Sequence, residues 1–330
     1  MTDVPGLEEA PVERARFIGI FMLVLAVLML SVAIVQQITF LKRLSDISGK
    51  PFPISPALIS AGLMNLLQRH DAPRASHEQL CRVHAPEYLD EIECRAPAEG
   101  LVSLDQDTRM GPHSLEAVYR AAGAMVLGVE LVLNRKADTA FCSIRPPGHH
   151  AERDHAMGFC IVNNVAVGAA HALASGLDRV AIVDFDVHHG NGTESLLQTD
   201  ERIMLCSVFQ HPFYPDAPLV LDNPRIIHAP LAAGACSEDF QQAVHEHLLP
   251  ALHRFKPELI LISAGFDGHF EDDMGQLNLL DGDYYQVTSD IVEIAAKYAG
   301  GRVVSTLEGG YALHALGRSA MQHVRALMQL

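Results

Sequence analysis

Two runs of histidines and carboxylates in the middle of the chain contain the residue types that acid–base and metal chemistry require. The first run holds the pair His149–His150, and the second, DFDVHH, holds Asp184, Asp186 and His188. The second run directly follows RVAIV, an apolar run typical of a fully buried parallel strand. Because ligands of open α/β sheets bind at the carboxyl ends of the strands, we expect these side chains to lie together at such an edge.

Polar or glycine-rich runs also end two other predicted strands. AGFDGH contains Asp267, and LEGGY contains Tyr311. If these strand ends lie side by side, Asp267 joins Asp186 and His188 in a group that suits a divalent ion such as Zn²⁺ and leaves room for water. The histidine pair would supply acid–base chemistry, and a tyrosine on a Gly-Gly hinge could donate to an oxyanion. Each piece alone is a weak signal, but their joint placement at the strand ends predicts a catalytic site.

Apolar runs of strand length alternate with helix-period segments over most of the chain. This alternation predicts an α/β fold with an open, mostly parallel doubly wound sheet flanked by helices. Upstream, 58–70 is predicted as a helix, Ser76 and Gln79 have capping-box spacing, and 101–112 is predicted as an irregular loop. The predicted strands are 139–144, 179–183, 203–209, 226–231, 258–263 and 302–306, and the main helices 114–134, 163–175, 237–255, 281–298 and 312–329.

Composition limits the classes of function. With 330 residues, 49% of them hydrophobic, the chain can form one large α/β domain or two small ones. A formal net charge of −16 argues against direct nucleic-acid binding, which needs Lys and Arg at phosphates, and fits a cationic substrate better. The six cysteines form no C-x-x-C motif, and Cys142 and Cys206 fall in predicted buried strands. We therefore expect reduced thiols in a cytoplasmic compartment.

An uncharged apolar run near the start of the chain has the length of a membrane span. It covers the nineteen residues 17–35, and basic residues flank it almost equally on both sides, so they indicate no orientation. The alternative is that the run packs in the core. We therefore expect an N-terminal apolar segment, 1–43, as a candidate membrane anchor, followed by a catalytic domain, 44–330.

The motifs RPPGHHAERDHAMGFC, DFDVHHGNGT, SAGFDGH and LEGGY resemble the zinc-dependent histone deacetylase and acetylpolyamine amidohydrolase family, in its bacterial class II-like branch. The resemblance runs from about residue 58 to the C-terminus. It implies the arginase/deacetylase fold for a deacetylase-like domain at 44–330. It also implies a zinc-dependent amidohydrolase that removes acetyl, or another short acyl group, from an amine such as Nε-acetyl-lysine.

The resemblance implies a role for each matching position. Asp186, His188 and Asp267 would bind one Zn²⁺ per chain, and His150 would be the general base and acid. His149 would be an imidazolium oriented by Asp184, Asn191 would stand in place of a second orienting carboxylate, and Tyr311 would be the oxyanion donor. The channel walls would be Gly158, Phe159 and Tyr214, and Asp105 or Asp107 would lie at the rim. A monovalent cation (K⁺) would bind at Asp184, Asp186, His188 and Ser207.

Three departures from the family pattern affect these expectations. Asn191 should leave His150 less basic than a carboxylate would, and Asp216-Ala-Pro in place of a Gly-Thr-Gly turn should alter the channel rim. The entrance segment 51–63 keeps its prolines but lacks the family's His, Glu and Arg. We therefore expect the first strand of the family's sheet to be missing or to be supplied by residues 17–35.

Other functions remain open from the sequence. One is an acetylpolyamine or small-metabolite deacylase of the same fold, and another is a catalytically silent, membrane-tethered binding module. The intact ligand group, the histidine pair and Tyr311 argue against silence, and HHGN has too few carboxylates for a binuclear manganese enzyme of the arginase kind. His155 and His189 are expected to be structural. Two further partners stay open: a membrane, through residues 17–35, and a second copy of the chain in a homo-oligomer.

Overall fold

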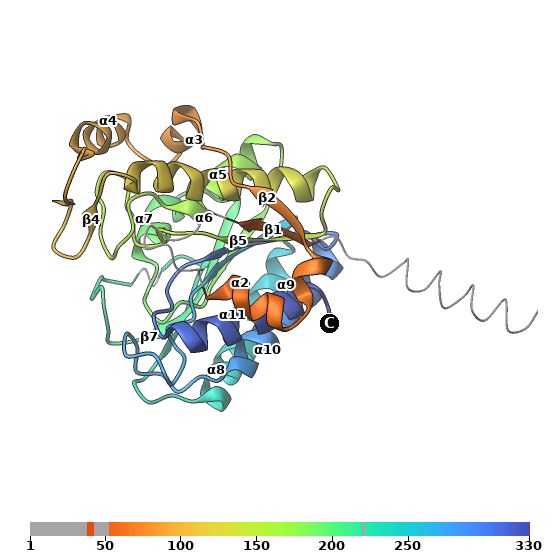
Figure 1. Cartoon of the computed structure of the whole chain (residues 1–330). Helices are drawn as coiled ribbons and strands as arrows, with labels where there is room; N and C mark the ends of the chain where they lie inside the picture. Colours follow the sequence, from red (N-terminus) through yellow and green to blue (C-terminus); the bar gives the residue numbers. More distant parts are fainter. Residues whose placement is uncertain (1–37, 43–52, 220–221) are drawn as a thin grey trace, which may run out of the picture. The chain divides into compact units, whose positions relative to one another are not determined.

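The computed structural model describes residues 38–42, 53–219 and 222–330, the first of these ranges by its backbone only (Figure 1). The apolar run 17–35 lies outside the described residues. All described residues belong to one compact unit, 37–330. Within the ranges described, no helix has both the length and the apolar character of a membrane span.

An eight-stranded sheet forms the centre of this unit, with the order β2-β1-β5-β10-β9-β6-β7-β8. Each neighbouring pair is parallel, which confirms the predicted doubly wound sheet. The four strands with polar or glycine-rich ends, β5, β10, β9 and β6, are neighbours in this order. The strands are β1 Ile38–Lys42, β2 Gln68–Asp71, β5 Thr139–Ser143, β6 Val180–Asp184, β7 Ile203–Gln210, β8 Ile226–Leu231, β9 Leu259–Ala264 and β10 Val303–Leu307.

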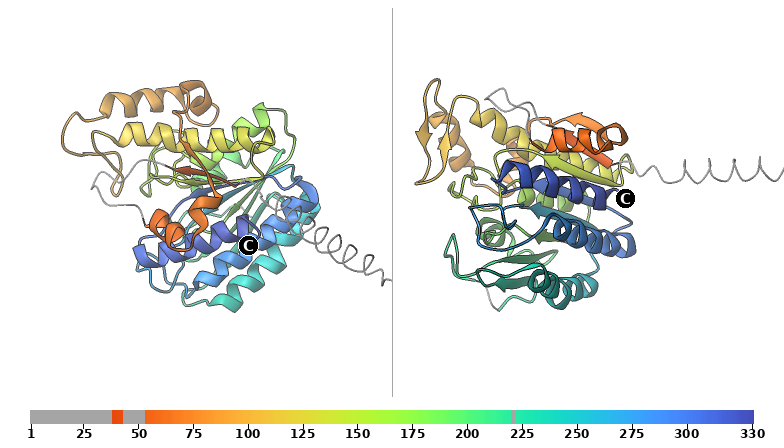
Figure 2. Two further views of the ribbon diagram at one scale, coloured as in Figure 1. Left: turned by 45° about the vertical axis from the view of Figure 1, so that its right-hand side comes forward. Right: turned by 60° about the horizontal axis from the view of Figure 1, so that its bottom comes forward.

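Helices cover both faces of the sheet (Figures 1 and 2). Successive strand residues therefore pack on opposite sides: in β9, Ile260 and Ile262 belong to one apolar cluster, and Leu259 and Leu261 to the other. One face carries α3 His77–Cys81, α4 Pro86–Arg95, α5 Ser114–Leu133, α6 Asn164–Ala174 and α7 Asn191–Leu197. The other carries α2 Ile54–Ser60, α8 Ser237–Ala243, the π-helical turn η2 Val244–Leu248, α9 Leu249–Phe255, α10 Asp281–Tyr298 and α11 Leu313–Leu327.

The sequence predictions are confirmed from residue 114 onward to within two residues, except that η2 interrupts the helix predicted at 237–255. The helix predicted at 58–70 is wrong. Helix α2 ends before Gly62, whose left-handed backbone (φ 73°) cannot continue it, and a 3₁₀ turn, Leu63–Leu66, then leads into β2. The loop predicted at 101–112 contains a small antiparallel pair, β3 Val102–Ser103 and β4 Arg109–Met110. At β2, pairing with β1 outweighs the local preference for a helix.

The first strand of the sheet differs from expectation as well. We expected it to be missing or to come from residues 17–35. The structure instead forms β1 from Ile38–Lys42, between β2 and β5. The residues that follow the apolar run thus contribute a strand to the sheet.

A buried histidine joins α10, α11 and β10. His323 is fully buried, with Nδ1 2.6 Å from Thr288 Oγ1 and Nε2 2.8 Å from Ser305 Oγ. Since the Thr288 hydroxyl donates to the Tyr284 carbonyl, His323 Nδ1 donates to Thr288 and Nε2 accepts from Ser305. This neutral form is the stable one, because burial lowers the pKa of His323 to about 3.

We expect this histidine to make stability fall in mild acid. Between about pH 6.5 and pH 3 the unfolded chain binds a proton at His323 that the folded chain excludes, so the free energy of unfolding decreases as the pH falls. The loss of stability caused by His323→Gln should be smaller at pH 5 than at pH 7 by roughly 1–2 kcal/mol. Denaturant unfolding of both proteins at the two pH values measures this. A pH-independent difference, or the same behaviour in a His247→Gln control at an exposed site, would contradict it.

Candidate active site

The four central strand ends bring the predicted residues to one cavity of about 290 Å³. Asp267, after the end of β9, contacts the lining residue His188. Asp184 and Asn191 bond to the lining residues His149 and His150, and Ser207 pairs with Asp184 in the sheet. Predicted residues that line the cavity are Asp107, His149, His150, Gly158, Phe159, Asp186, His188, Tyr214 and Tyr311. The other lining residues are Pro147, Phe213, Asp273, Met274 and Gly309.

Asp186, His188 and Asp267 form a compact group of metal-ligand type. His188 Nδ1 lies 3.0 Å from Asp186 Oδ1 and 3.3 Å from Asp267 Oδ2, and all three residues are buried. Asp267 Oδ2 has no hydrogen-bond donor among the described residues, although it is buried. A Cβ atom at position 309 would collide with both carboxylates, so Gly309 is required to leave them room. An unpartnered buried carboxylate oxygen beside a second carboxylate and an imidazole fits a divalent cation.

The surroundings shift the pKa values of the two carboxylates of this group in opposite directions. Burial and the charge of Asp186 raise the pKa of Asp267 above its ordinary value. Burial acts on Asp186 in the same direction, but the positive charge of His149 and the hydrogen bonds and charge of His188 outweigh it and lower the pKa of Asp186. A cation between the carboxylates would remove the repulsion that opposes ionisation of Asp267.

Of the two adjacent histidines, His149 is held in its charged form and His150 in its neutral form. His149 Nδ1 lies 3.0 Å from Asp184 Oδ2. Burial opposes its charged form, but the carboxylates of Asp186 and Asp184 raise the pKa of His149 to about 10. For His150, burial and the charge of His149 lower the pKa well below its ordinary value. The site therefore holds an imidazolium beside a neutral imidazole, with ring centroids 4.0 Å apart.

A carboxylate that the sequence did not indicate supports His150 through Asn191. The Asn191 Nδ2 amide donates to Glu152 Oε1 at 2.8 Å, so its Oδ1 faces His150 Nδ1 at 2.8 Å and accepts from it. This arrangement leaves the lone pair of His150 on Nε2. Nothing in the sequence pattern distinguishes Glu152 from a surface glutamate.

Glu308 is the second residue that the sequence analysis missed. It is fully buried and accepts the N–H groups of Gly148 at 2.6 Å and His149 at 3.2 Å, and the Ser263 hydroxyl at 3.1 Å. Burial raises the pKa of Glu308 to about 7. The residue ties the ends of β5 and β9 to β10 and so fixes the histidine pair. The available signal was its place in LEGGY, immediately after a predicted strand.

Aromatic side chains line the cavity, and Asp107 links them. The ring of Tyr214 lies edge-on to His150 with centroids 5.2 Å apart, and Phe159 lies edge-on to Tyr311 at 6.0 Å. Asp107 Oδ2 accepts the Tyr214 hydroxyl at 3.2 Å, and Oδ1 accepts the N–H of Gly158, which precedes Phe159, at 3.1 Å. Of the two candidate rim carboxylates, Asp107 therefore joins the cavity walls. Asp105 instead accepts the N–H of its neighbour Gln106.

Ser207 lies beside Asp184 in the expected monovalent-cation group. The two are register partners on β7 and β6. The Ser207 Oγ atom is buried and has no hydrogen-bond partner within the described ranges, which fits a cation that accepts oxygen ligands.

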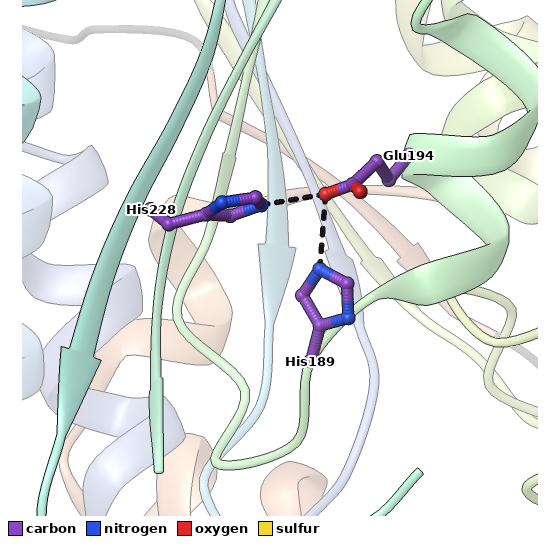
Figure 3. A group of neighbouring side chains, drawn as sticks. All are labelled: His189, Glu194 and His228. Atoms are coloured by element: carbon purple, nitrogen blue, oxygen red, sulfur yellow. Dashed lines mark hydrogen bonds and ion pairs between the residues drawn. The ribbon is translucent and has the colours of Figure 1, made fainter. Parts of the chain in front are cut away.

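A second histidine–carboxylate cluster lies outside the cavity lining (Figure 3). Glu194 Oε2 lies 3.0 Å from His189 Nε2 and 2.6 Å from His228 Nε2, and all three side chains are nearly buried. The donor atoms are close enough to hold a metal, but the two imidazole N–H groups already satisfy this carboxylate oxygen. Hydrogen bonding therefore accounts for the cluster, which ties α7 to β8.

Comparisons with known proteins agree with this site. Residues 52–327 match the family model for the histone deacetylase domain. A histone deacetylase-like amidohydrolase of Pseudomonas aeruginosa is 38% identical over 259 residues, covering 76% of this chain and 68% of that protein. An uncharacterized protein of Synechocystis is 36% identical over 313 residues, 90% of this chain and 99% of that one.

A crystal structure of an HDA15 HD domain superimposes with a TM-score of 0.81 at 27% identity and covers 89% of each chain. The fold, the strand-end residues and a domain match that spans most of the sequence agree. The chain belongs to the histone deacetylase family.

Proposed function

We propose that the protein is a zinc-dependent amidohydrolase that removes acetyl, or another short acyl group, from an amine such as Nε-acetyl-lysine. The observation that carries this proposal is that one cavity is lined by Asp186 and His188 of a buried metal-ligand group, by a neutral imidazole at His150 and by the phenol of Tyr311. Membership of the histone deacetylase family supports deacylation.

Each step of the reaction has a group in this cavity. Asp186, His188 and Asp267 would hold one Zn²⁺, which when bound polarises the acyl carbonyl and lowers the pKa of water. His150 Nε2 takes the proton of the attacking water, and the resulting imidazolium gives it to the leaving amine.

The remaining groups stabilise charge and set the geometry. The imidazolium of His149 and the hydroxyl of Tyr311 stabilise the oxyanion as it develops. Asp184 and Asn191 orient the two histidines. Asp184, Asp186, His188 and Ser207 would hold a K⁺ ion behind the zinc site, which would offset the buried negative charge there.

The charge of the cavity favours a cationic substrate. Besides Asp186, the lining carboxylates are Asp107 and the exposed Asp273, and the chain has a formal net charge of −16. An acetyl-lysine flanked by basic residues and an acetylpolyamine both meet this requirement. We infer that such an acylated amine is the substrate.

We further infer that the catalytic domain acts in the cytoplasm. The six cysteines are free, and Cys142, Cys160 and Cys206 are buried in the core. Unpaired thiols of this kind are usual in reducing compartments.

The first test is hydrolysis of a panel of acylated amines by the purified protein. We expect release of short acyl groups, loss of activity with a zinc chelator, and recovery on adding Zn²⁺. Asp186→Asn should lower bound zinc from about one equivalent to below about 0.1, because a three-ligand site tolerates the loss of a charged ligand poorly. His228→Asn, in the second cluster, is the matched control and should keep its zinc. The reverse pattern in elemental analysis would disprove the metal assignment.

Tyr311→Phe removes the expected oxyanion donor and nothing else. We expect turnover to fall by roughly 10²–10³ with zinc content unchanged, the usual effect of deleting one such donor. The control is Tyr298→Phe, which removes a hydroxyl that hydrogen-bonds with His253 away from the cavity. This variant should keep wild-type turnover. Near-normal kcat in Tyr311→Phe would exclude the residue from the mechanism.

The charge at the cavity mouth predicts a substrate preference. Replacing Asp273 by Asn should lower kcat/KM for a substrate with a second positive charge, relative to a neutral analogue, by roughly two- to fivefold. The preference should weaken at high salt, because exposed charges are screened. Glu201→Gln, another exposed carboxylate that does not line the cavity, should leave the ratio unchanged. A ratio unaffected by Asp273→Asn would show that this carboxylate does not select the substrate.

A further inference from the structure

Asp272 is a buried carboxylate in the loop that follows the metal-ligand residue Asp267. Its neighbours Glu271 and Asp273 are exposed, whereas Asp272 is only 5% exposed. Its Oδ2 atom accepts the N–H of Tyr311 at 2.6 Å and that of Ala312 at 2.8 Å. A buried carboxylate that receives two backbone N–H groups on one oxygen makes strong, charge-assisted hydrogen bonds.

The same carboxylate also shapes its own loop. Oδ1 of Asp272 accepts the N–H of Met274 at 3.0 Å, and the backbone N–H of Asp272 donates to the His269 carbonyl at 2.8 Å. These two hydrogen bonds within the loop hold the Asp272 carboxylate in the position from which it contacts the turn after β10. Asp272 connects two loops that both contribute to the cavity, one through Met274 and the other through Tyr311.

The turn that carries Tyr311 needs such a constraint. It begins with Gly309 and Gly310, and Gly310 has a φ of 128°, which side-chain-bearing residues rarely adopt. Arg145 Nη2 donates to the Gly310 carbonyl at 2.9 Å, and its guanidinium lies 5.5 Å from the centroid of the Tyr311 ring. The backbone N–H groups on the other side of the turn are held by Asp272.

We propose that Asp272 is a positioning residue that sets the place of the Tyr311 hydroxyl in the cavity. This rests on the proposed function, in which that hydroxyl donates to the oxyanion. An oxyanion donor must lie about 3 Å from the oxygen atom, and a misplacement of about 1 Å costs up to roughly 10² in rate. Removing the carboxylate releases both N–H groups of the turn, so the hydroxyl samples positions that do not reach the acyl oxygen.

The test is a double-mutant cycle of Asp272 with Tyr311, measured on the zinc-loaded enzyme. In the wild-type background Asp272→Ala should lower kcat by roughly 10–10², with KM changed less than about threefold and zinc content unchanged. Asp272→Asn should recover part of the rate, since its amide oxygen still accepts from the turn. In the Tyr311→Phe background the same substitutions should change kcat by less than about twofold, because no hydroxyl remains to be positioned.

Glu258 provides a matched control. Its Oε2 atom also accepts two backbone N–H groups, those of Asp178 at 2.8 Å and Arg179 at 3.0 Å, but at the amino end of β9, opposite the cavity. Glu258→Ala should keep wild-type kcat.

Two results would overturn the proposal: equal losses of kcat in both backgrounds, or wild-type kcat in Asp272→Asn and Asp272→Ala. If Asp272→Ala does not fold, the kcat of Asp272→Asn is compared in the wild-type and Tyr311→Phe backgrounds by the same criteria. Failure of the proposed function is a separate result, because it is seen in Tyr311→Phe alone as unchanged turnover.

Discussion

Negative charge buried at the carboxyl ends of the central strands is the constraint on which the rest of the site depends. Four carboxylates there are no more than 1% exposed: Asp184, Asp186, Asp267 and Glu308. Burying a carboxylate costs several kcal/mol unless hydrogen bonds or positive charges compensate. The compensation comes from the imidazoles of His149 and His188 and from the backbone N–H groups of Gly148, His149, Val187, His188 and Gly309. The loops after the strands take the shapes that bring these donors to the carboxylates.

The same buried charge separates the roles of two neighbouring histidines. His149 faces carboxylates and is held as an imidazolium, whereas His150 faces the amide of Asn191 and that imidazolium, and stays neutral. When their surroundings shift the pKa values of two neighbouring groups in opposite directions, the neutral group can act as a general base while the charged group stabilises negative charge. Asn191 in place of a carboxylate contributes to this separation, since it offers His150 a hydrogen-bond acceptor without a negative charge.

Two loop carboxylates tie the cavity walls together. Asp107 joins the segments that carry Phe159 and Tyr214, and Asp272 joins the loop after β9 to the turn that carries Tyr311. Both act through hydrogen bonds between residues far apart in sequence, so the cavity walls depend on contacts that form only once the sheet is assembled. The wall residues are therefore held by polar contacts on a scaffold that the apolar core makes rigid.

The sequence alone determined the strands from β5 onward and the groups at the ends of the central strands. Long apolar runs predict buried parallel strands, and a polar residue directly after such a run lies at the sheet edge whatever the rest of the chain does, as for Asp186 and Asp267. Only the tertiary structure decided β1 and β2, the choice of Asp107 over Asp105, and the parts played by Glu152 and Asp272. These depend on pairing or hydrogen bonding between segments that are distant in the chain, and local periodicity carries no information about which partners will meet.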